Sequence, residues 1–185
     1  MKACIFLAPG FEEIEALATC DVLRRCGMDV SLISISNDVH VTGANGITVK
    51  ADYVLDVCNS AEADWMICPG GMPGSTNLYE CEKLAELLVQ HADSGKYVAA
   101  ICAAPAVVLA QLGLLSGRNA TCYPGFEDLL VQGGAKPQSA RVIVDGNIVT
   151  GNGPSSAIPF ALKIAEIALG KDVAKQVADG MLVNF

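Results

Sequence analysis

One cysteine stands where a strand-like segment runs directly into helix-forming sequence. Residues 97–101 are apolar and β-friendly, Cys102 follows them, and the next residues are rich in Ala and Leu. A cysteine at such a turn lies near a helix N-terminus, where free N–H groups and the helix dipole favour the thiolate. Serine hydrolases use this geometry in their nucleophile elbow. The sequence therefore predicts an exposed nucleophilic thiol, with a buried core cysteine as the alternative.

A carboxylate in the first predicted helix is the next candidate. Glu15 shares a helical stripe with Ala18, Thr19 and Val22 rather than with solvent-facing charges. An ionised carboxylate is costly to bury, so we expect Glu15 to be hydrogen-bonded or protonated there. The alternative is a glutamate on the flank of the helix that reaches solvent.

The glycine-rich turn at residues 69–75 also follows a predicted strand. It lacks the Lys and Ser/Thr of a phosphate-binding loop and does not match G-x-G-x-x-G, so it gives little support to a nucleotide site. In one interpretation Gly70 and Gly71 bring a backbone N–H close to a reacting carbonyl as part of an oxyanion hole. The alternative is a tight turn that simply requires glycine.

Cysteine and histidine usage argues against a metal site. The chain has eight cysteines, none in a C-x-x-C pair, and only two histidines, His40 and His91. These residues never cluster at ligand spacing, so we expect no metal and no other cofactor. With no secretory signal at the N-terminus, the thiols are expected to be reduced, as in a cytoplasmic protein.

Composition limits the range of partners. The 185 residues carry a net charge of −8 and a pI near 4.6, which argues against nucleic acid and anionic membranes. The strongly apolar stretch, residues 97–110, has 14 residues and is too short for a membrane span. We expect a single domain over residues 1–185.

Strand-like and helix-like segments alternate along the chain, which is typical of an α/β sandwich with a mainly parallel sheet. The predicted strands are residues 3–8, 30–36, 65–69, 97–101 and 119–122, with a short edge strand within 48–57. The predicted helices are residues 12–26, 77–94, 103–112, 126–132 and 155–169. Residues 141–144 and 147–150 flank Asp145-Gly146, which predicts a hairpin with a type I′ turn.

Ligands of open α/β sheets bind beyond the carboxyl ends of the strands. Three Gly/Pro-rich turns follow predicted strands, at residues 9–10, 69–75 and 103–105. We expect these turns to gather at one edge of the sheet together with Cys102.

Five segments resemble the ThiJ/PfpI superfamily, also called the DJ-one superfamily, in order and spacing. They are MxxCIFLAPGFEEIEA, PGGMPGS, AAICAAPAVVLA, GxGPSSAIPFAL and GKDVAKQV. The resemblance covers essentially the whole chain and is closest to the short, single-domain branch that includes the parkinsonism-associated protein and its bacterial relatives. It implies a three-layer, flavodoxin-like sandwich, related in architecture to the class I glutamine amidotransferases, and a homodimer.

The resemblance also implies roles for individual residues. The family's nucleophilic cysteine, in A-I-C-[AG]-x-P, falls on Cys102, and the glutamate of E-E-x-E falls on Glu15. This glutamate is expected to be protonated and to contact the Cys102 sulfur. The glycine pair of the family's turn falls on Gly70 and Gly71, and the residue after the nucleophile is Ala103. The resemblance favours the functional interpretation of both Cys102 and Glu15.

Two positions depart from the family pattern. Tyr123 occupies the place where many members have a histidine, and a neutral phenol donates hydrogen bonds but is a poor base at neutral pH. Ala44-Asn45 occupies the place of an arginine that helps to hold an oxidised cysteine across the dimer. Arg25 matches an arginine near the end of helix one and is a candidate for anion support.

The resemblance points to a stress-response enzyme that acts on methylglyoxal, glyoxal or their adducts, of the glutathione-independent glyoxalase or deglycase type. Cys102 would add to the aldehyde, Glu15 would transfer protons, and the N–H groups of Gly71 and Ala103 would hold the oxyanion. The alternative is a redox sensor or chaperone that uses oxidation of the same cysteine. An intracellular cysteine peptidase fits less well, since it needs a Cys–His pair.

Overall fold

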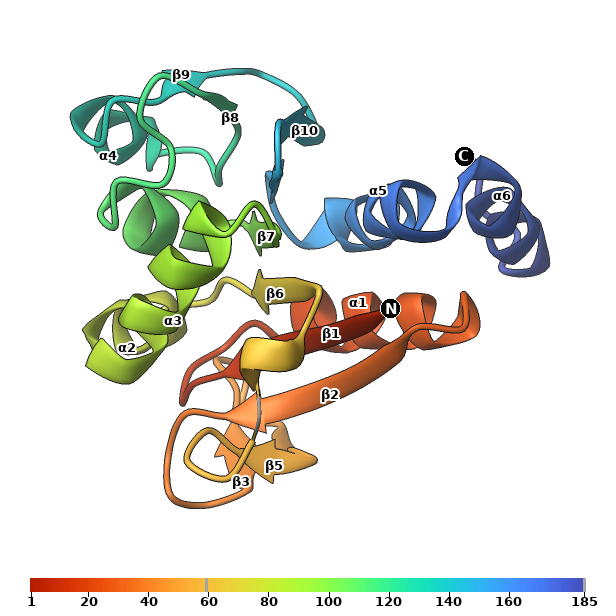
Figure 1. Cartoon of the computed structure of the whole chain (residues 1–185), viewed down its shortest axis with the longest axis horizontal. Coiled ribbons are helices and arrows are strands. Elements are labelled where there is room, and N and C mark those ends of the chain that lie inside the picture. The colour runs from red at the N-terminus through yellow and green to blue at the C-terminus, as the bar shows by residue number, and fades with distance from the viewer. Residues whose placement is uncertain (59, 185) are drawn as a thin grey trace.

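A seven-stranded sheet runs through the centre of the molecule (Figure 1). The computed structural model describes residues 1–58 and 60–184, without the side chain of residue 61. The strands, in spatial order, are β10 (Val142–Asp145), β11 (Ile148–Gly151), β7 (Tyr97–Ile101), β6 (Trp65–Cys68), β1 (Lys2–Leu7), β2 (Asp29–Ser34) and β5 (Tyr53–Val54). All neighbours are parallel except β10 and β11, as the sequence predicts.

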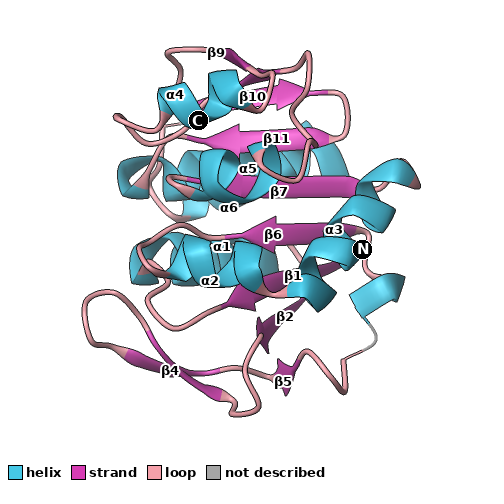
Figure 2. Ribbon diagram, turned by 90° about the vertical axis from the view of Figure 1, so that its left-hand side faces the viewer, coloured by secondary structure: helices cyan, strands magenta, loops and turns pink. Residues whose placement is uncertain are grey.

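Helices cover both faces of this sheet, so the predicted three-layer sandwich is confirmed (Figure 2). One face carries α1 (Glu13–Arg25) and α5 (Ala157–Leu169), with α6 (Lys171–Gly180) packed against α5. The other face carries α2 (Gly74–Glu80), α3 (Glu82–Asp93), the π-type helix η2 (Pro105–Ala110) and α4 (Glu127–Gln132). None of the described helices is both long and apolar enough to cross a bilayer.

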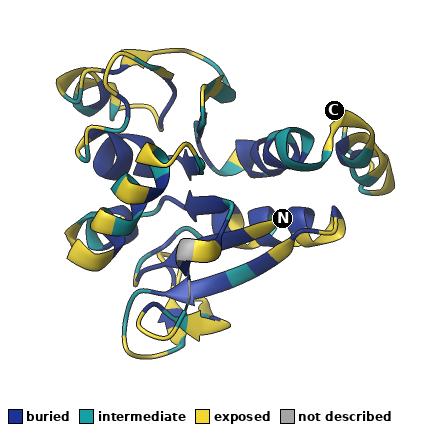
Figure 3. Ribbon diagram, viewed as in Figure 1, coloured by how far each residue is buried: buried dark blue, intermediate teal, exposed yellow. Residues whose placement is uncertain are grey.

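Strand β1 shows why the strands have continuous apolar runs. Side chains of a strand point alternately to the two faces, and here each face is covered. Ala3, Ile5 and Leu7 pack into the cluster under α1 and α5, whereas Cys4, Phe6 and Ala8 pack under α2 and α3. The central strands are accordingly buried along most of their length (Figure 3).

Two predicted elements differ in the structure. The predicted strand at residues 119–122 is only β8 (Asn119–Ala120), which pairs with β9 (Lys136–Pro137) outside the main sheet. The predicted helix at residues 77–94 is two helices, α2 and α3, because Cys81 between them has an extended backbone with ψ of 91°. The sequence analysis also missed α6, whose buried residues are only Ala174 and Ala178.

The hairpin of β10 and β11 is confirmed, but its turn is displaced by one residue. Asp145 pairs with Ile148, so Gly146 and Asn147 form the two-residue turn. Only Gly146 of these two has a positive φ, 61°, as in a type II′ turn rather than type I′.

The predicted edge strand is β5, and before it β3 (His40–Thr42) and β4 (Thr48–Lys50) form a separate hairpin. The short 3-10 helices η1 (Ser60–Glu62) and η3 (Pro154–Ser156) precede β6 and α5.

Candidate active site

The Gly/Pro-rich turns meet at the carboxyl edge of the sheet, as predicted. The Gly74 N–H donates to the carbonyl oxygen of Gly10 at 3.1 Å, which joins the turn after β1 to the turn after β6. The Glu12 N–H donates to the carbonyl oxygen of Gly70 at 3.0 Å and ties the start of α1 to the same turn. Residues 10–12 and 70–74, remote in sequence, therefore lie together, and Gly70 packs directly against Cys102 at the end of β7.

Cys102 forms the sharp turn that the sequence predicts. Its φ is 66°, in the left-handed region that non-glycine residues rarely adopt. Hydrogen bonds hold this backbone on both sides: the Cys102 N–H donates to Gly151 at 2.9 Å, and its carbonyl accepts the Tyr123 N–H at 2.8 Å. The expected exposure is wrong, since the side chain is 8% exposed. The turn buries the thiol among neighbouring loops instead of presenting it to solvent.

Glu15 is fully buried, which excludes the interpretation as a solvent-facing glutamate. Its Oε2 accepts the N–H of Gly70 at 2.8 Å, whereas the equally buried Oε1 has no hydrogen-bond partner. Burial raises the pKa of Glu15 to about 7, against the opposing effect of hydrogen bonds with Cys102 and Gly70. The carboxyl group can therefore gain or lose a proton near neutral pH.

The thiol of Cys102 has a high rather than a low pKa while Glu15 is ionised. Burial, followed by the charge and hydrogen bond of Glu15, raises the pKa of Cys102 to about 12. The predicted preference for the thiolate is wrong in that state, although the N–H groups of Gly71 and Ala103 do act in its favour. When Glu15 takes the proton, the repulsion disappears and the acid becomes a donor to sulfur, so that only the burial of Cys102 still disfavours the thiolate.

The two glycines of the turn after β6 are required by close packing. A Cβ at Gly70 would lie 2.5 Å from the Cβ of Cys102 and 2.7 Å from Oε2 of Glu15. Gly71 has a φ of 87°, and a Cβ there would lie 2.5 Å from the backbone nitrogen of Glu12. The tight-turn interpretation is confirmed, and the turn also directs the Gly71 N–H to the Cys102 sulfur. The oxyanion hole stays a prediction.

Glu12 and Glu13, at the start of α1, each hold a different backbone segment by hydrogen bonds. Glu12 is the N-cap rather than a first-turn residue, and its carboxylate accepts the Glu15 N–H at 2.7 Å. Glu13 is 3% exposed and accepts the backbone N–H of Asn45 at 2.7 Å and its side-chain amide at 2.9 Å. Burial raises the pKa of Glu13, but the hydrogen bonds from Asn45 and Ile47 outweigh it, so the pKa lies below its usual value. Sequence analysis missed both roles, because glutamate is not one of the usual N-cap residues and Asn45 is far from Glu13 in sequence.

Two of the predicted site residues lie differently from expectation. Arg25 pairs with Asp21 at 2.7 Å and lies ten residues after Glu15, about 15 Å along the helix axis. The same chain therefore does not bring Arg25 to Cys102, and anion support from Arg25 across a dimer stays a prediction. Tyr123 is adjacent through its backbone, while its side chain is 44% exposed beside Gly153. Donation from its hydroxyl stays a prediction.

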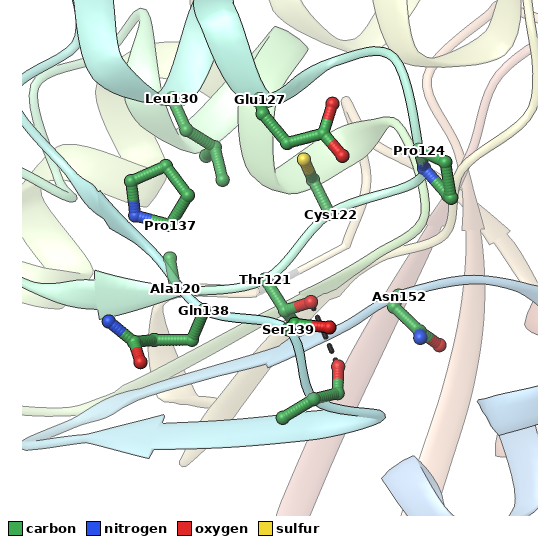
Figure 4. A pocket seen from close by; sticks show the side chains of 11 residues that line it. Ala120, Thr121, Cys122, Pro124, Glu127, Leu130, Pro137, Gln138, Ser139 and Asn152 are labelled. Carbon is green, nitrogen blue, oxygen red and sulfur yellow. Dashed lines mark hydrogen bonds between the residues drawn. The ribbon is translucent and has the colours of Figure 1, made fainter.

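A cavity of about 310 Å³ lies next to the segment that contains Tyr123 (Figure 4). Cys122, Glu127 and Asn152 line it, but Cys102 and Glu15 do not.

Neither histidine approaches Cys102: His40 pairs with Asp38 at 3.0 Å, and His91 is buried on α3. Within residues 1–58 and 60–184, no group of three or more His, Cys, Asp or Glu could hold a metal ion.

Known proteins resemble this chain over most or all of its length. The profile of the DJ-1/PfpI family matches residues 1–167. Protein DJ-1 homolog B of Arabidopsis thaliana is 38% identical over 99% of this chain, although the chain spans only 42% of that longer protein. A Caenorhabditis elegans protein named glutathione-independent glyoxalase DJR-1.2 is 38% identical over 92% of this chain and 90% of its own length. The structure of oxidized Toxoplasma gondii DJ-1 superimposes with a TM-score of 0.95, at 40% identity, and covers 100% of this chain and 99% of that one.

Proposed function

The chain belongs to the DJ-1/PfpI family, and we propose that it is a cysteine-dependent enzyme that acts on methylglyoxal, glyoxal or their adducts. The relative from C. elegans that is named a glutathione-independent glyoxalase supports this class of substrate. We infer that Cys102 is the nucleophile and that Glu15 is its proton partner.

The observation that carries the proposal is the contact between a buried acid and a buried thiol. Glu15 has a pKa of about 7 and interacts with the thiol of Cys102, whose sulfur also receives the N–H groups of Gly71 and Ala103. A general acid or base is most effective when its pKa lies near the working pH. Glu15 is therefore suited to accept the thiol proton and to return it to the substrate.

The first step forms a bond between the Cys102 sulfur and the aldehyde carbon. Glu15 takes the thiol proton as the sulfur attacks, and it then protonates the oxygen of the resulting hemithioacetal. Before that protonation the oxygen carries the negative charge of the broken carbonyl π bond. The N–H groups of Gly71 and Ala103 would stabilise this charge.

The second step is an internal oxidation and reduction of the substrate. Glu15, again ionised, removes the proton from the hemithioacetal carbon and returns it to the neighbouring carbon. The hydroxyl proton passes to the neighbouring oxygen, so the former ketone becomes an alcohol and the hemithioacetal becomes a thioester. Water then hydrolyses the thioester, releases a 2-hydroxy acid and restores the thiol. The sum is one α-oxoaldehyde plus one water giving one 2-hydroxy acid, so no glutathione or external oxidant is consumed.

The test is incubation of the purified protein with methylglyoxal without glutathione, with lactate measured over time. We expect turnover by the wild type, none by Cys102→Ser, and a decrease of about 10²–10⁴-fold for Glu15→Gln. Glu13→Gln is the matched control, because it neutralises another buried carboxylate of α1 that does not contact the sulfur. A second arm with methylglyoxal adducts of thiols and amines separates a glyoxalase from a deglycase. Equal lactate formation by wild type and Cys102→Ser would refute the proposal.

A redox sensor is the second candidate, and one observation favours it. The N–H groups of Gly71 and Ala103 that face the sulfur can also donate to the oxygens of a sulfinate at Cys102. Mass spectrometry after limited peroxide treatment tests this candidate: a protein without turnover that gains about 32 Da at Cys102 would support it.

A homodimer also remains part of the proposal. Ile14 on α1 is apolar yet 58% exposed, which is consistent with burial against a second copy. Sedimentation equilibrium of the wild type, with Ile14→Glu for comparison, measures this directly.

A further inference from the structure

Two further cysteines contact each other far from Cys102. Cys4 lies in the first half of β1 and Cys58 in the turn after β5, and their side chains lie close enough for each thiol to shift the pKa of the other. Both line a cavity of about 220 Å³ and pack against the same apolar cluster. Cys102 follows the carboxyl end of β7, which is parallel to β1, so the pair is separate from the proposed active site.

We propose that Cys4 and Cys58 are a redox-active pair that forms a reversible intramolecular disulfide on reaction with a hydroperoxide.

The fold holds the two thiols in place. The Leu55 N–H donates to the carbonyl oxygen of Ser34 at 2.8 Å, which anchors this turn to β2. The Cys58 N–H donates to Val54 at 3.2 Å, so the cysteine ends a hydrogen-bonded turn rather than a free loop. On the other side, Cys4 is fixed in β1 between β2 and β6. The contact therefore follows from anchored backbone on both sides.

The two thiols differ in how far they are exposed to solvent, so each is suited to a different step of the reaction. Cys58 is half-buried, whereas Cys4 is 6% exposed. Burial and the neighbouring Cys58 raise the pKa of Cys4 to about 12, with Asp29 adding to the effect and Lys2 opposing it. The pKa of Cys58 is also raised by burial, against a smaller opposing effect of Cys4, so the two thiols differ in accessibility rather than in the direction of the shift. Cys58 is thus the thiol that meets the peroxide, and Cys4 is the resolving thiol.

The reaction balances with the hydroperoxide as the oxidant. The Cys58 thiolate attacks the outer peroxide oxygen and breaks the O–O bond, which gives a sulfenic acid and an alcohol, or water from hydrogen peroxide. Cys4 then attacks the sulfenic sulfur, forms the S–S bond and expels hydroxide, which is protonated to water. Two thiols lose two electrons and the peroxide gains them.

The test uses the intact wild-type chain and hydrogen peroxide near stoichiometric amounts. After free thiols are alkylated, non-reducing peptide mapping should show one cross-linked species that joins the Cys4 and Cys58 peptides. Its mass should be about 2 Da below the sum of the two peptides, and dithiothreitol should separate them. A sulfinate at Cys102 gains about 32 Da instead, so the two oxidations are distinguished in one spectrum.

Two variants make the result decisive. Cys58→Ser should remove the cross-link, whereas Cys81→Ser should leave it unchanged, because Cys81 is also half-buried but lies in the break between α2 and α3. Cys58 is in a turn, so its replacement does not disturb the central sheet. Oxidation of Cys58 to sulfinic acid without the Cys4 cross-link, or a cross-link found only between two chains, would overturn the proposal.

Discussion

The Gly70 N–H donates to Oε2 of Glu15 at 2.8 Å and so fixes the carboxyl group of α1 to the turn after β6. The same turn sends the Gly71 N–H to the sulfur of Cys102. One tight turn therefore positions both members of the proposed acid–thiol pair relative to each other. Only glycine fits at residue 70. A larger side chain there would disturb both the packing of this turn and the contact between Glu15 and Cys102.

Gly70→Ala should separate the acid from the thiol. The new Cβ would lie 2.5 Å from the Cβ of Cys102 and 2.7 Å from Oε2 of Glu15, so one of the two side chains must move. Overpacking of this kind typically costs about 1–3 kcal/mol. We expect a large loss of methylglyoxal turnover together with a moderate loss of stability. Gly180→Ala, where a Cβ meets nothing within 4 Å, is the control: it should leave turnover unchanged and should not destabilise the protein, because alanine is the better helix former. Full activity of a folded Gly70→Ala protein would contradict this arrangement.

Glu15→Gln should become more stable relative to the wild type as the pH rises. The folded protein holds a proton on Glu15 up to a pKa of about 7, whereas the ordinary pKa of a glutamate, as in the unfolded chain, is 4.5. Between these values the unfolded chain releases the proton and the folded chain keeps it, so the wild type loses stability with rising pH. The glutamine has no such dependence. The difference amounts to at most about 3 kcal/mol above the window.

Urea unfolding of both proteins at several pH values measures this difference. The curves should diverge between pH 4.5 and about 7 and run parallel outside that window. A constant difference across the whole range would mean that Glu15 keeps an ordinary pKa in the folded state.

The alkylation rate of Cys102 should follow the titration of Glu15. The pair loses its first proton near pH 7 and its second near pH 12, so the thiolate population is constant between these values. We expect the rate with iodoacetamide to rise up to about pH 7 and then to level off, and the plateau to vanish in Glu15→Gln. Peptide mapping, with the half-buried Cys81 as internal reference, measures the rate. A rate that keeps rising through pH 9 in the wild type would sink this prediction.

The sequence predicts the parts of the fold that depend on periodicity. The apolar runs of β1, β6 and β7 predict the covered parallel strands, and the turn residues after them predict the edge where the site lies. It does not predict the break at Cys81 or the departure of residues 119–122 from the main sheet, because the helix-forming and apolar patterns continue through both. Tertiary contacts decide these positions.

Sequence analysis predicts which residues meet at the candidate site better than it predicts their pKa values. The position of Cys102 after a strand correctly predicts the turn, whereas the apolar stripe leaves the burial of Glu15 open and the family resemblance decides it. The high pKa of the thiol could not be predicted, since it depends on how closely Glu15 and the turn at Gly70 enclose the sulfur. The hydrogen bonds from Asn45 to Glu13 could not be predicted either, because the two residues are far apart in sequence.

Asn45→Asp should destabilise the protein in a pH-dependent way. In the wild type the Asn45 amide donates to Glu13 at 2.9 Å, and the aspartate would place a second carboxylate there instead. Losing a hydrogen bond to a charged group costs about 1.5–3 kcal/mol, and repulsion adds to it.

Because hydrogen bonds hold the pKa of Glu13 below 4.5, Glu13 contributes stability above that pH and loses it as the pH falls. Protonation of either acid removes the repulsion, so the gap between variant and wild type should narrow below about pH 5. Urea unfolding at pH 7 and pH 4 measures the gap. Asn45→Ala, which removes the donor without adding charge, should show a smaller loss that also shrinks at pH 4, because the lost hydrogen bond lowers the pKa of Glu13 in the wild type. An equal loss for both variants at both pH values would mean that residue 45 does not act on α1 through the charge of Glu13.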